Sequence, residues 1–366
     1  LTDPSISLDA HVYHGFTQLP AGFTLVMDRV ARQHILDNIR QNLRQNSNTL
    51  SRSLGELANA LGRRPTLAEF LEHGSITPED LYRRQISWSR LCVHAGQREQ
   101  FQEPDERRLT KGFRRVAHWN DPQHIQALLQ WLDRTDRSSD PNAIDSVEQR
   151  RILMLEIGIW TSSALPDSAA ETLQRFNANP ILRDELHQLL SYQLSLIDSV
   201  STPIPLAFEC PLALHSLYTR DEILVGLGHW TRQRRPDLRE GVLHLPKIAT
   251  DALFVTLNKT EKDYSPTTMY EDYAINDHLF HWQSQSTKAV DSPTGRRYIE
   301  HEQRGSTILL FVREHKTRYG LTQPYHFLGP AIYVEHSGRK PMSVTWRLVA
   351  PLPARLSRTL VRLTVA

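Results

Sequence analysis

The stretch TILLFVRE, residues 307–314, is an apolar run that ends in charged residues. Runs of this kind, rich in β-branched and aromatic side chains and bounded by Gly, Pro and polar residues, are typical of strands. Similar runs occur nearby: ALFVTL (252–257), LFHW (279–282), PAIYVEH (330–336) and SVTWRLVA (343–350). One helical pattern interrupts them, with Thr219 and Glu222 at capping-box spacing. We therefore expect residues 206–366 to form a β-rich, barrel-like domain.

The chain before this domain has the periodicity of helices. Apolar residues recur at helical spacing at Leu36, Ile39 and Leu43, and again at Leu50, Leu54, Leu57 and Leu61. Thr66 with Glu69 has capping-box spacing, and Thr77 before Pro78, Glu79 and Asp80 is a second helix start. The proline-rich stretch STPIPLAFECP, residues 201–211, marks a boundary. The prediction is an α+β protein with an all-α region over residues 1–205 and the β-rich domain over residues 206–366.

Composition indicates a soluble globular protein. Hydrophobic residues make up 39% and charged residues 23% of the chain, and no apolar run is long enough to span a membrane. Cys92 and Cys210 give neither a disulfide framework nor a zinc-ligand spacing. We expect no membrane partner, no metal and a cytoplasmic location.

The formal net charge of +2 is too small to indicate nucleic-acid binding by itself, so the charge has to be judged locally. Basic residues cluster in RRLTKGFRR (107–115), in RQRR (232–235) and at one Arg pair. The candidates for contact with a DNA backbone are Arg107, Arg108, Lys111, Arg114, Arg115, Arg232, Arg234, Arg235, Arg296 and Arg297. The alternative for each cluster is an ordinary solvated surface.

Motifs of self-contained enzymes are absent from the sequence. There is no phosphate-binding loop, no dinucleotide-binding fingerprint, no H-E-x-x-H and no G-x-S-x-G, so we expect no catalytic residue in this chain. The nearest pattern is Glu314-x-Lys316 after a strand, which with Asp291 would suit a Mg²⁺-dependent nuclease, but an exposed strand end over residues 313–316 is the favoured interpretation. His11 and His14 lack a third clustered ligand. LGELANALGRRPTLAEFL (54–71) has the cadence of a helix-turn-helix, which is also common outside DNA binding.

The segment YEDYAINDHLFHWQSQS, residues 270–286, combines aromatic rings with hydrogen-bonding groups. A strand would alternate such residues for burial, whereas a pocket for a flipped base needs flat stacking walls and groups that bind the base edge. The candidate pocket residues are Tyr270, Asp272, Tyr273, Asn276, Phe280, Trp282, Gln283 and Ser284.

Several stretches taken together resemble a known family. LYTRDEILVGLG (217–228), MYEDYAINDHLFHWQSQS (269–286), ILLFVREHK (308–316), PYHFLGPAIYVEHSGRKPMSVTWRL (324–348) and PLPARL (351–356) look like the domain, formerly of unknown function, at the C-terminus of bacterial DEAD/DEAH-type helicases. Many of those helicases begin with a phospholipase-D-like nuclease. LPAGFTLVMDRVARQHILDNIRQNL (19–43), RPTLAEFL (64–71) and DLYRRQISWSRLC (80–92) resemble the helical segment before that domain.

The resemblance implies a role in recognising modified DNA. Members of the group include type IV restriction enzymes that cut DNA with methylated or hydroxymethylated cytosine. Their terminal domain is similar to the SET-and-RING-associated barrel, which flips a modified cytosine, and their helical part couples it to the motor. The chain lacks motor and nuclease motifs, so ATP and Mg²⁺ would belong to helicase and nuclease domains of the same or a partner chain. The alternatives are a protein-interaction or autoinhibitory module without base readout and, less favoured, the Mg²⁺-dependent nuclease.

Overall fold

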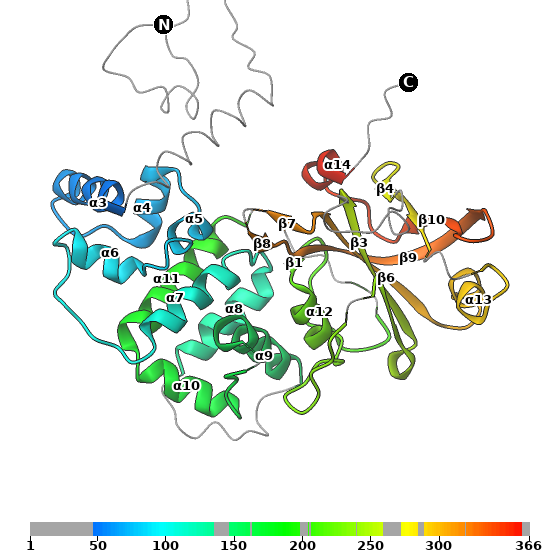
Figure 1. Ribbon diagram of the computed structural model, residues 1–366, viewed down its shortest axis with the longest axis horizontal. Helices are drawn as coiled ribbons and strands as arrows, with labels where there is room; N and C mark the ends of the chain where they lie inside the picture. The colour runs from blue at the N-terminus through cyan, green and yellow to red at the C-terminus, as the bar shows by residue number, and fades with distance from the viewer. Residues whose placement is uncertain are drawn as a thin grey trace, which may run out of the picture. The chain divides into compact units, whose positions relative to one another are not determined.

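The computed structural model describes residues 47–134, 146–161, 163–197, 204, 206–238, 240–258, 272–284, 289–318 and 320–360. The chain divides into two compact units, Leu1–Arg114 and Arg115–Ala366, and each is described by itself. The boundary that the sequence predicts between residues 205 and 206 lies inside the second unit, between a group of helices and the first strand (Figure 1).

The described part of the first unit is helical. Its elements are α3 (Ser47–Leu61), α4 (Leu67–Gly74), α5 (Pro78–Tyr82), α6 (Trp88–His94) and most of α7 (Glu106–Val116). Both predicted helix starts are confirmed. The Thr66 hydroxyl accepts a bond from the Glu69 amide at 3.2 Å while the Glu69 carboxylate accepts one from the Thr66 amide at 2.8 Å. Thr77 caps α5, with Pro78 in its first turn.

The predicted leucine stripe of α3 is only partly correct. Leu50 and Leu54 are buried, but the stripe continues at Ala58, and Leu61 is 41% exposed. A spacing of four residues follows the 3.6-residue helical turn closely enough to keep Leu50, Leu54 and Ala58 on one face. Leu61, three residues beyond Ala58, lies at the end of the helix, where the core no longer covers it.

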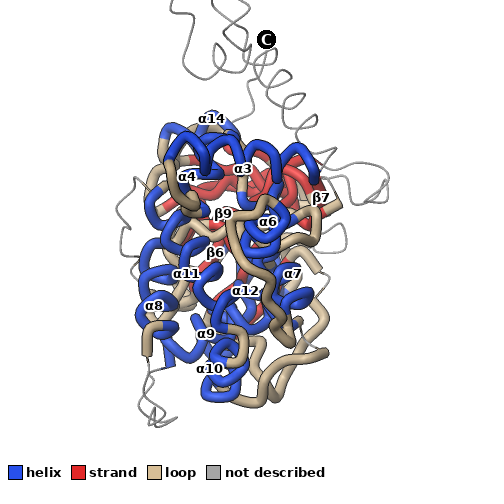
Figure 2. The backbone as a smooth tube through the Cα atoms, turned by 90° about the vertical axis from the view of Figure 1, so that its left-hand side faces the viewer, coloured by secondary structure: helices blue, strands red, loops and turns tan. Residues whose placement is uncertain are grey.

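The second unit begins with helices that lie on one side of the strands in both views (Figures 1 and 2). These helices are α8 (Pro122–Leu132), α9 (Ser146–Trp160), α10 (Ala169–Asn177) and α11 (Pro180–Ser195). A further helix, α12 (Arg220–Gly226), follows the first strand and packs against α9. The predicted capping box of α12 is confirmed, because Glu222 accepts a bond from the Thr219 amide at 2.6 Å and Thr219 accepts one from the Glu222 amide at 3.4 Å.

An 8-stranded mixed sheet forms the rest of the second unit, in the order β2-β3-β6-β9-β10-β5-β4 with β1 paired to β9. The strands are β1 (Leu217–Tyr218), β2 (Val242–Leu245), β3 (Thr250–Asn258), β4 (Tyr273–Ala274), β5 (Leu279–Gln283), β6 (Thr307–His315), β9 (Tyr325–Ser337) and β10 (Ser343–Leu348). β3 and β6 run parallel, and the other pairs are antiparallel. A small ribbon, β7 (Thr317–Arg318) with β8 (Leu321–Thr322), stands apart from the sheet.

The sheet is open, which corrects the expectation of a barrel. The α+β class and the strand-rich C-terminal part are confirmed, but the strand path starts at β2 and ends at β4. A closed barrel has hydrogen bonds between its first and last strands. In the described residues β2 pairs with β3 and β4 pairs with β5, and no ladder joins β2 to β4.

The central strands are buried on both faces. On β6, Leu309 and Phe311 face one apolar cluster with α9 and α12, whereas Ile308, Leu310 and Val312 face another. The second cluster also contains side chains of β5, β10, α13 (Pro293–Ile299) and α14 (Ala354–Leu360). Continuous apolar runs such as residues 307–312 are explained by this two-sided burial. Among the described helices, none combines the length and the apolar character needed to cross a membrane.

Candidate functional site

The segment 272–284 forms a β-hairpin at the end of the sheet. β4 and β5 pair with Tyr273 opposite His281 and Ala274 opposite Phe280. Asn276 makes the turn, because its side-chain oxygen accepts bonds from the His278 and Leu279 amides, each at 2.8 Å. Successive β5 side chains alternate between the core and the outer face, as strand geometry requires.

Three of the predicted pocket residues are held in the core. Phe280 is fully buried, and Trp282 packs edge-on against Tyr298 with ring centroids 5.4 Å apart. Ser284 is also buried and exchanges two bonds with Met342, one from its amide at 2.8 Å and one to its hydroxyl at 2.9 Å. A stacking role for Phe280 or Trp282 would therefore require this packing to open.

The structure gathers Asp272, Tyr273 and Gln283 at one end of the hairpin. Asp272 is 8% exposed, and its Oδ1 accepts a bond from the Gln283 amide at 2.9 Å. The Gln283 side chain donates to the Ser343 hydroxyl at 3.3 Å. Asn276 lies at the opposite, turn end of the hairpin, and Tyr270 falls outside the described residues.

A stacked aromatic pair lies on the outer face of this hairpin. The rings of Tyr273 and His281 are 4.8 Å apart and inclined by 16°, and both side chains are partly exposed. Thr345 of β10 pairs with His281 on the far side. His281 was not among the predicted site residues, although its position between Phe280 and Trp282 indicates the outward face by simple alternation. The hairpin thus offers a partly exposed aromatic surface on its outer face.

The predicted basic residues divide into inward and outward groups. Arg115 donates to the Gly158 and Ile159 carbonyls at 2.5 and 2.6 Å, Arg232 pairs with buried Glu156, and Arg297 pairs with buried Asp251. These contacts hold each of the three guanidinium groups to a partner inside the second unit. The exposed members are Arg107, Arg108, Arg234, Arg235 and Arg296.

Lys111 and Arg114 are neither fully exposed nor among the basic residues held by internal contacts. Both are partly buried on α7, and the Nε of Arg114 is buried with no hydrogen-bond partner in the described part of the chain. Burial, together with the nearby charge of Arg83, lowers the pKa of Arg114. Arg107 and Arg108 are exposed and accessible to a DNA phosphate, whereas Arg114 is partly buried.

Glu156 makes the stability of the second unit depend on pH. Burial raises its pKa from 4.5 to about 7, against the opposing effects of Arg232 and Thr172. The folded state therefore retains a proton that the unfolded state loses above pH 4.5, so stability falls as the pH rises from there to about 7 and levels off above it. Relative to Glu156→Gln, the wild type is expected to lose up to about 3 kcal/mol across this interval. Urea unfolding of both proteins at a series of pH values measures the difference, and parallel pH profiles would contradict it.

The Glu314-x-Lys316 pattern lies at the end of β6. Glu314 is within 3.2 Å of its neighbour His315, and Asp291 pairs with Arg339 at 2.9 Å. Within the described residues, no three His, Cys, Asp or Glu side chains gather in a way that could hold a metal ion. His11 and His14 fall outside those residues.

Comparison with known proteins finds a family match in the C-terminal part of the chain. No curated protein matches the chain. Residues 212–360 match the family described as a domain of unknown function (DUF3427). The matched region starts just before β1 and ends with α14, so it contains the whole mixed sheet, α12, α13 and the hairpin with Tyr273 and His281.

Proposed function

We propose that this chain is the DNA-recognition module of a modification-dependent helicase-nuclease. In this proposal, the sheet-containing region binds duplex DNA with a modified cytosine, which is flipped out of the helix, and the helical region passes the event to a motor. ATP hydrolysis and Mg²⁺-dependent cleavage belong to helicase and nuclease domains elsewhere in the same or a partner chain. The family match is consistent with the resemblance noted in the sequence and does not itself carry a function.

The observation that carries the proposal is the partly exposed, stacked pair of Tyr273 and His281 on the outer face of the hairpin. The two rings are already in contact, so a base would stack on the outer surface of the pair rather than between them. Stacking of a base on an aromatic side chain contributes about 1–3 kcal/mol. Together with hydrogen bonds to the base edge, this offsets the few kcal/mol needed to extrude a base.

Asp272 is the proposed reader of the exocyclic amine. An ionised carboxylate only accepts hydrogen bonds, and cytosine N4 offers donors where thymine offers an acceptor. The exposed Arg107, Arg108, Arg234 and Arg296 would add contacts to the backbone that do not depend on sequence.

Electrophoretic binding of the chain to matched duplexes tests the proposal. The duplexes carry cytosine, methylcytosine or hydroxymethylcytosine at one position and are otherwise identical. The proposal requires tighter binding to at least one modified duplex. Equal affinity for the three duplexes at several salt concentrations would contradict recognition of the modified base.

Asp272→Asn tests the reader more sharply than an alanine substitution. The Asn side-chain oxygen still accepts a hydrogen bond from the Gln283 amide, so the hairpin keeps this bond. The new side-chain NH2 group, however, would face the N4 amine of cytosine, and two donors cannot bond each other. The preference for a modified duplex is expected to fall by about 1–3 kcal/mol with little change in melting temperature. A lowered melting temperature with unchanged preference would assign Asp272 a structural role alone.

A protein-interaction module is the second candidate, and one observation favours it. Ile275, Val334 and Val349 are 39%, 46% and 43% exposed, and they lie near the β4-β5-β10-β9 end of the sheet. Exposed apolar side chains of this kind occur at protein interfaces. Replacing Val334 and Val349 with Ser would weaken capture of a helicase partner under this function and leave duplex binding unchanged.

A further inference from the structure

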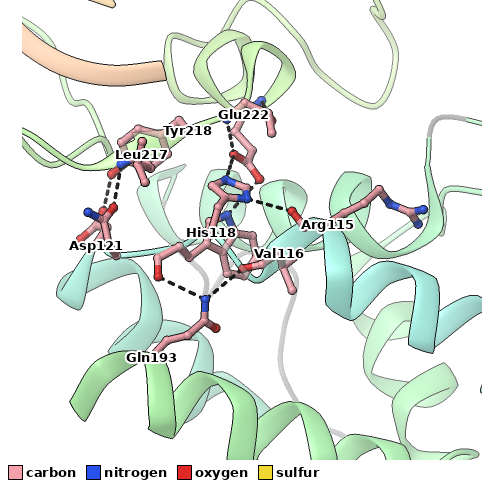
Figure 3. Close-up of polar contacts among 11 residues, drawn as sticks. Arg115, Val116, His118, Asp121, Gln193, Leu217, Tyr218 and Glu222 are labelled. Carbon is pink, nitrogen blue, oxygen red and sulfur yellow. Dashed lines mark hydrogen bonds and ion pairs between the residues drawn. The ribbon is translucent and has the colours of Figure 1, made fainter. Parts of the chain in front are cut away.

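The connection between α7 and α8 contacts the family-matched region through residues 118–121. Figure 3 shows His118 and Asp121 of this connection beside Leu217, Tyr218 and Glu222. Trp119 Nε1 donates to Glu222 Oε1 at 2.9 Å, and His118 Nε2 lies 3.1 Å from Glu222 Oε2. Asn120 Oδ1 accepts a hydrogen bond from the Leu217 amide at 2.7 Å. Asp121 Oδ2 accepts one from the Tyr218 hydroxyl at 2.5 Å. We call residues 118–121 together with Leu217, Tyr218 and Glu222 the latch.

Glu222 is the centre of the latch. It is 1% exposed, and besides His118 and Trp119 it accepts the Thr219 amide in the capping box of α12. Burial by itself acts to raise the pKa of Glu222, but the charge and hydrogen bond of His118, together with hydrogen bonds from the Thr219 amide and Trp119, lower the pKa overall. A buried carboxylate of this kind needs a countercharge.

The geometry of His118 specifies its protonation. Nε2 faces the Glu222 carboxylate, and Nδ1 lies 2.9 Å from the Arg115 carbonyl oxygen. Because carboxylate and carbonyl oxygens only accept, both ring nitrogens must carry hydrogen to make both bonds. The ring that satisfies this arrangement is the imidazolium ion.

None of the other titratable groups around the latch, among the described residues, supplies the countercharge that His118 gives to Glu222. Those that interact with the latch from the described elements include Asp121, Tyr218, Asp221, His124, Cys210, Arg115 and Arg151. Burial is the main cause that lowers the pKa of His124 to about 4, so this ring is neutral near neutral pH. Burial likewise raises the pKa of Tyr218, which remains a hydroxyl donor, and Arg115 points its guanidinium at carbonyls of α9.

We propose that the latch is a proton-dependent device that holds β1 and α12 to the helices of the second unit while His118 is protonated. When the ring loses its proton, one of its two bonds is lost and buried Glu222 loses its countercharge. At acid pH, protonation of Glu222 removes the same attraction from the other side. The latch is therefore closed at pH values where Glu222 is ionised and His118 is protonated. It opens when a rise in pH removes the proton from His118.

Amide hydrogen exchange in the full chain tests the proposal. The Leu217 amide reports directly on the latch, because it donates to Asn120 across it. After correction for intrinsic rates, its protection is expected to be about tenfold higher at about pH 6 than at about pH 8.5, on either side of the ordinary histidine value. His118→Gln is expected to give low protection at both values.

Two controls separate the latch from a general effect of pH. His187→Gln removes an exposed histidine 3.5 Å from Asp133, and Glu156→Gln removes the carboxyl group whose pKa burial raises to about 7. Both variants should keep the wild-type response at Leu217. In the wild type, NMR should show the Leu217 amide shift changing with the same midpoint as the His118 ring. A Leu217 amide that does not respond while His118 titrates, or a pH response that survives in His118→Gln, would overturn the proposal.

Discussion

Trp282→Ala is expected to lower the free energy of unfolding of the second unit by about 3–5 kcal/mol. The indole is 4% exposed and packs against Tyr298 at 5.4 Å and Trp346 at 6.2 Å. Its removal leaves a cavity between β5, β10 and α13 that the rigid sheet cannot close. Urea unfolding followed by circular dichroism measures the loss, and binding to modified and unmodified duplexes should weaken equally.

Tyr273→Ala is the matched control on the neighbouring strand. Tyr273 lies on the outer face, so its loss is expected to change the free energy of unfolding by less than about 1 kcal/mol. It should instead reduce affinity for the preferred modified duplex by about 1–3 kcal/mol, the contribution of one stacked base. If Trp282→Ala kept its stability and lost only the preference, Trp282 would be the base wall and the outer pair would not.

Features that depend on neighbours in sequence were predictable. The caps at Thr66, Thr77 and Thr219 are local patterns in which a side chain bonds a backbone group three residues away. The buried run at residues 307–312 was predicted as a strand because its composition suits a pleated, covered surface. Even so, the run does not say which strands lie beside it, and the parallel pairing of β3 with β6 joins segments that are far apart in the chain.

Features that depend on distant partners were not predictable. The pocket hypothesis grouped Phe280 and Trp282 with Tyr273, yet strand alternation separates the two kinds of ring onto opposite faces. Residues 118–121 have no local signal of their importance, because their partners lie about a hundred residues later in the chain. Arg115 and Arg232 belong to charge clusters in the sequence, but Gly158 and Glu156 hold them inside the structure.

Arg297→Ala is expected to lower the free energy of unfolding by about 3–5 kcal/mol, the usual effect of leaving a buried charge without its partner. Arg297 Nε and Nη2 donate to the two oxygens of Asp251 at 2.7 and 2.9 Å, and Asp251 is fully buried on β3. His244, 3.2 Å from the same carboxylate and 39% exposed, cannot replace a bidentate guanidinium in this position. Adding Asp251→Asn should restore part of the loss, because an amide is less costly to bury than an unpaired carboxylate.

Arg296→Ala, at the adjacent residue, is expected to change DNA binding and leave stability nearly unchanged. Arg296 is exposed, so its loss should leave stability within about 0.5 kcal/mol of the wild type. If it contacts a phosphate, the slope of log affinity against log salt should become shallower by about one unit for every duplex. Arg297→Ala should leave that slope unchanged once enough folded protein is present. A shallower slope in Arg297→Ala with normal stability would place Arg297 on the DNA and contradict its assignment to Asp251.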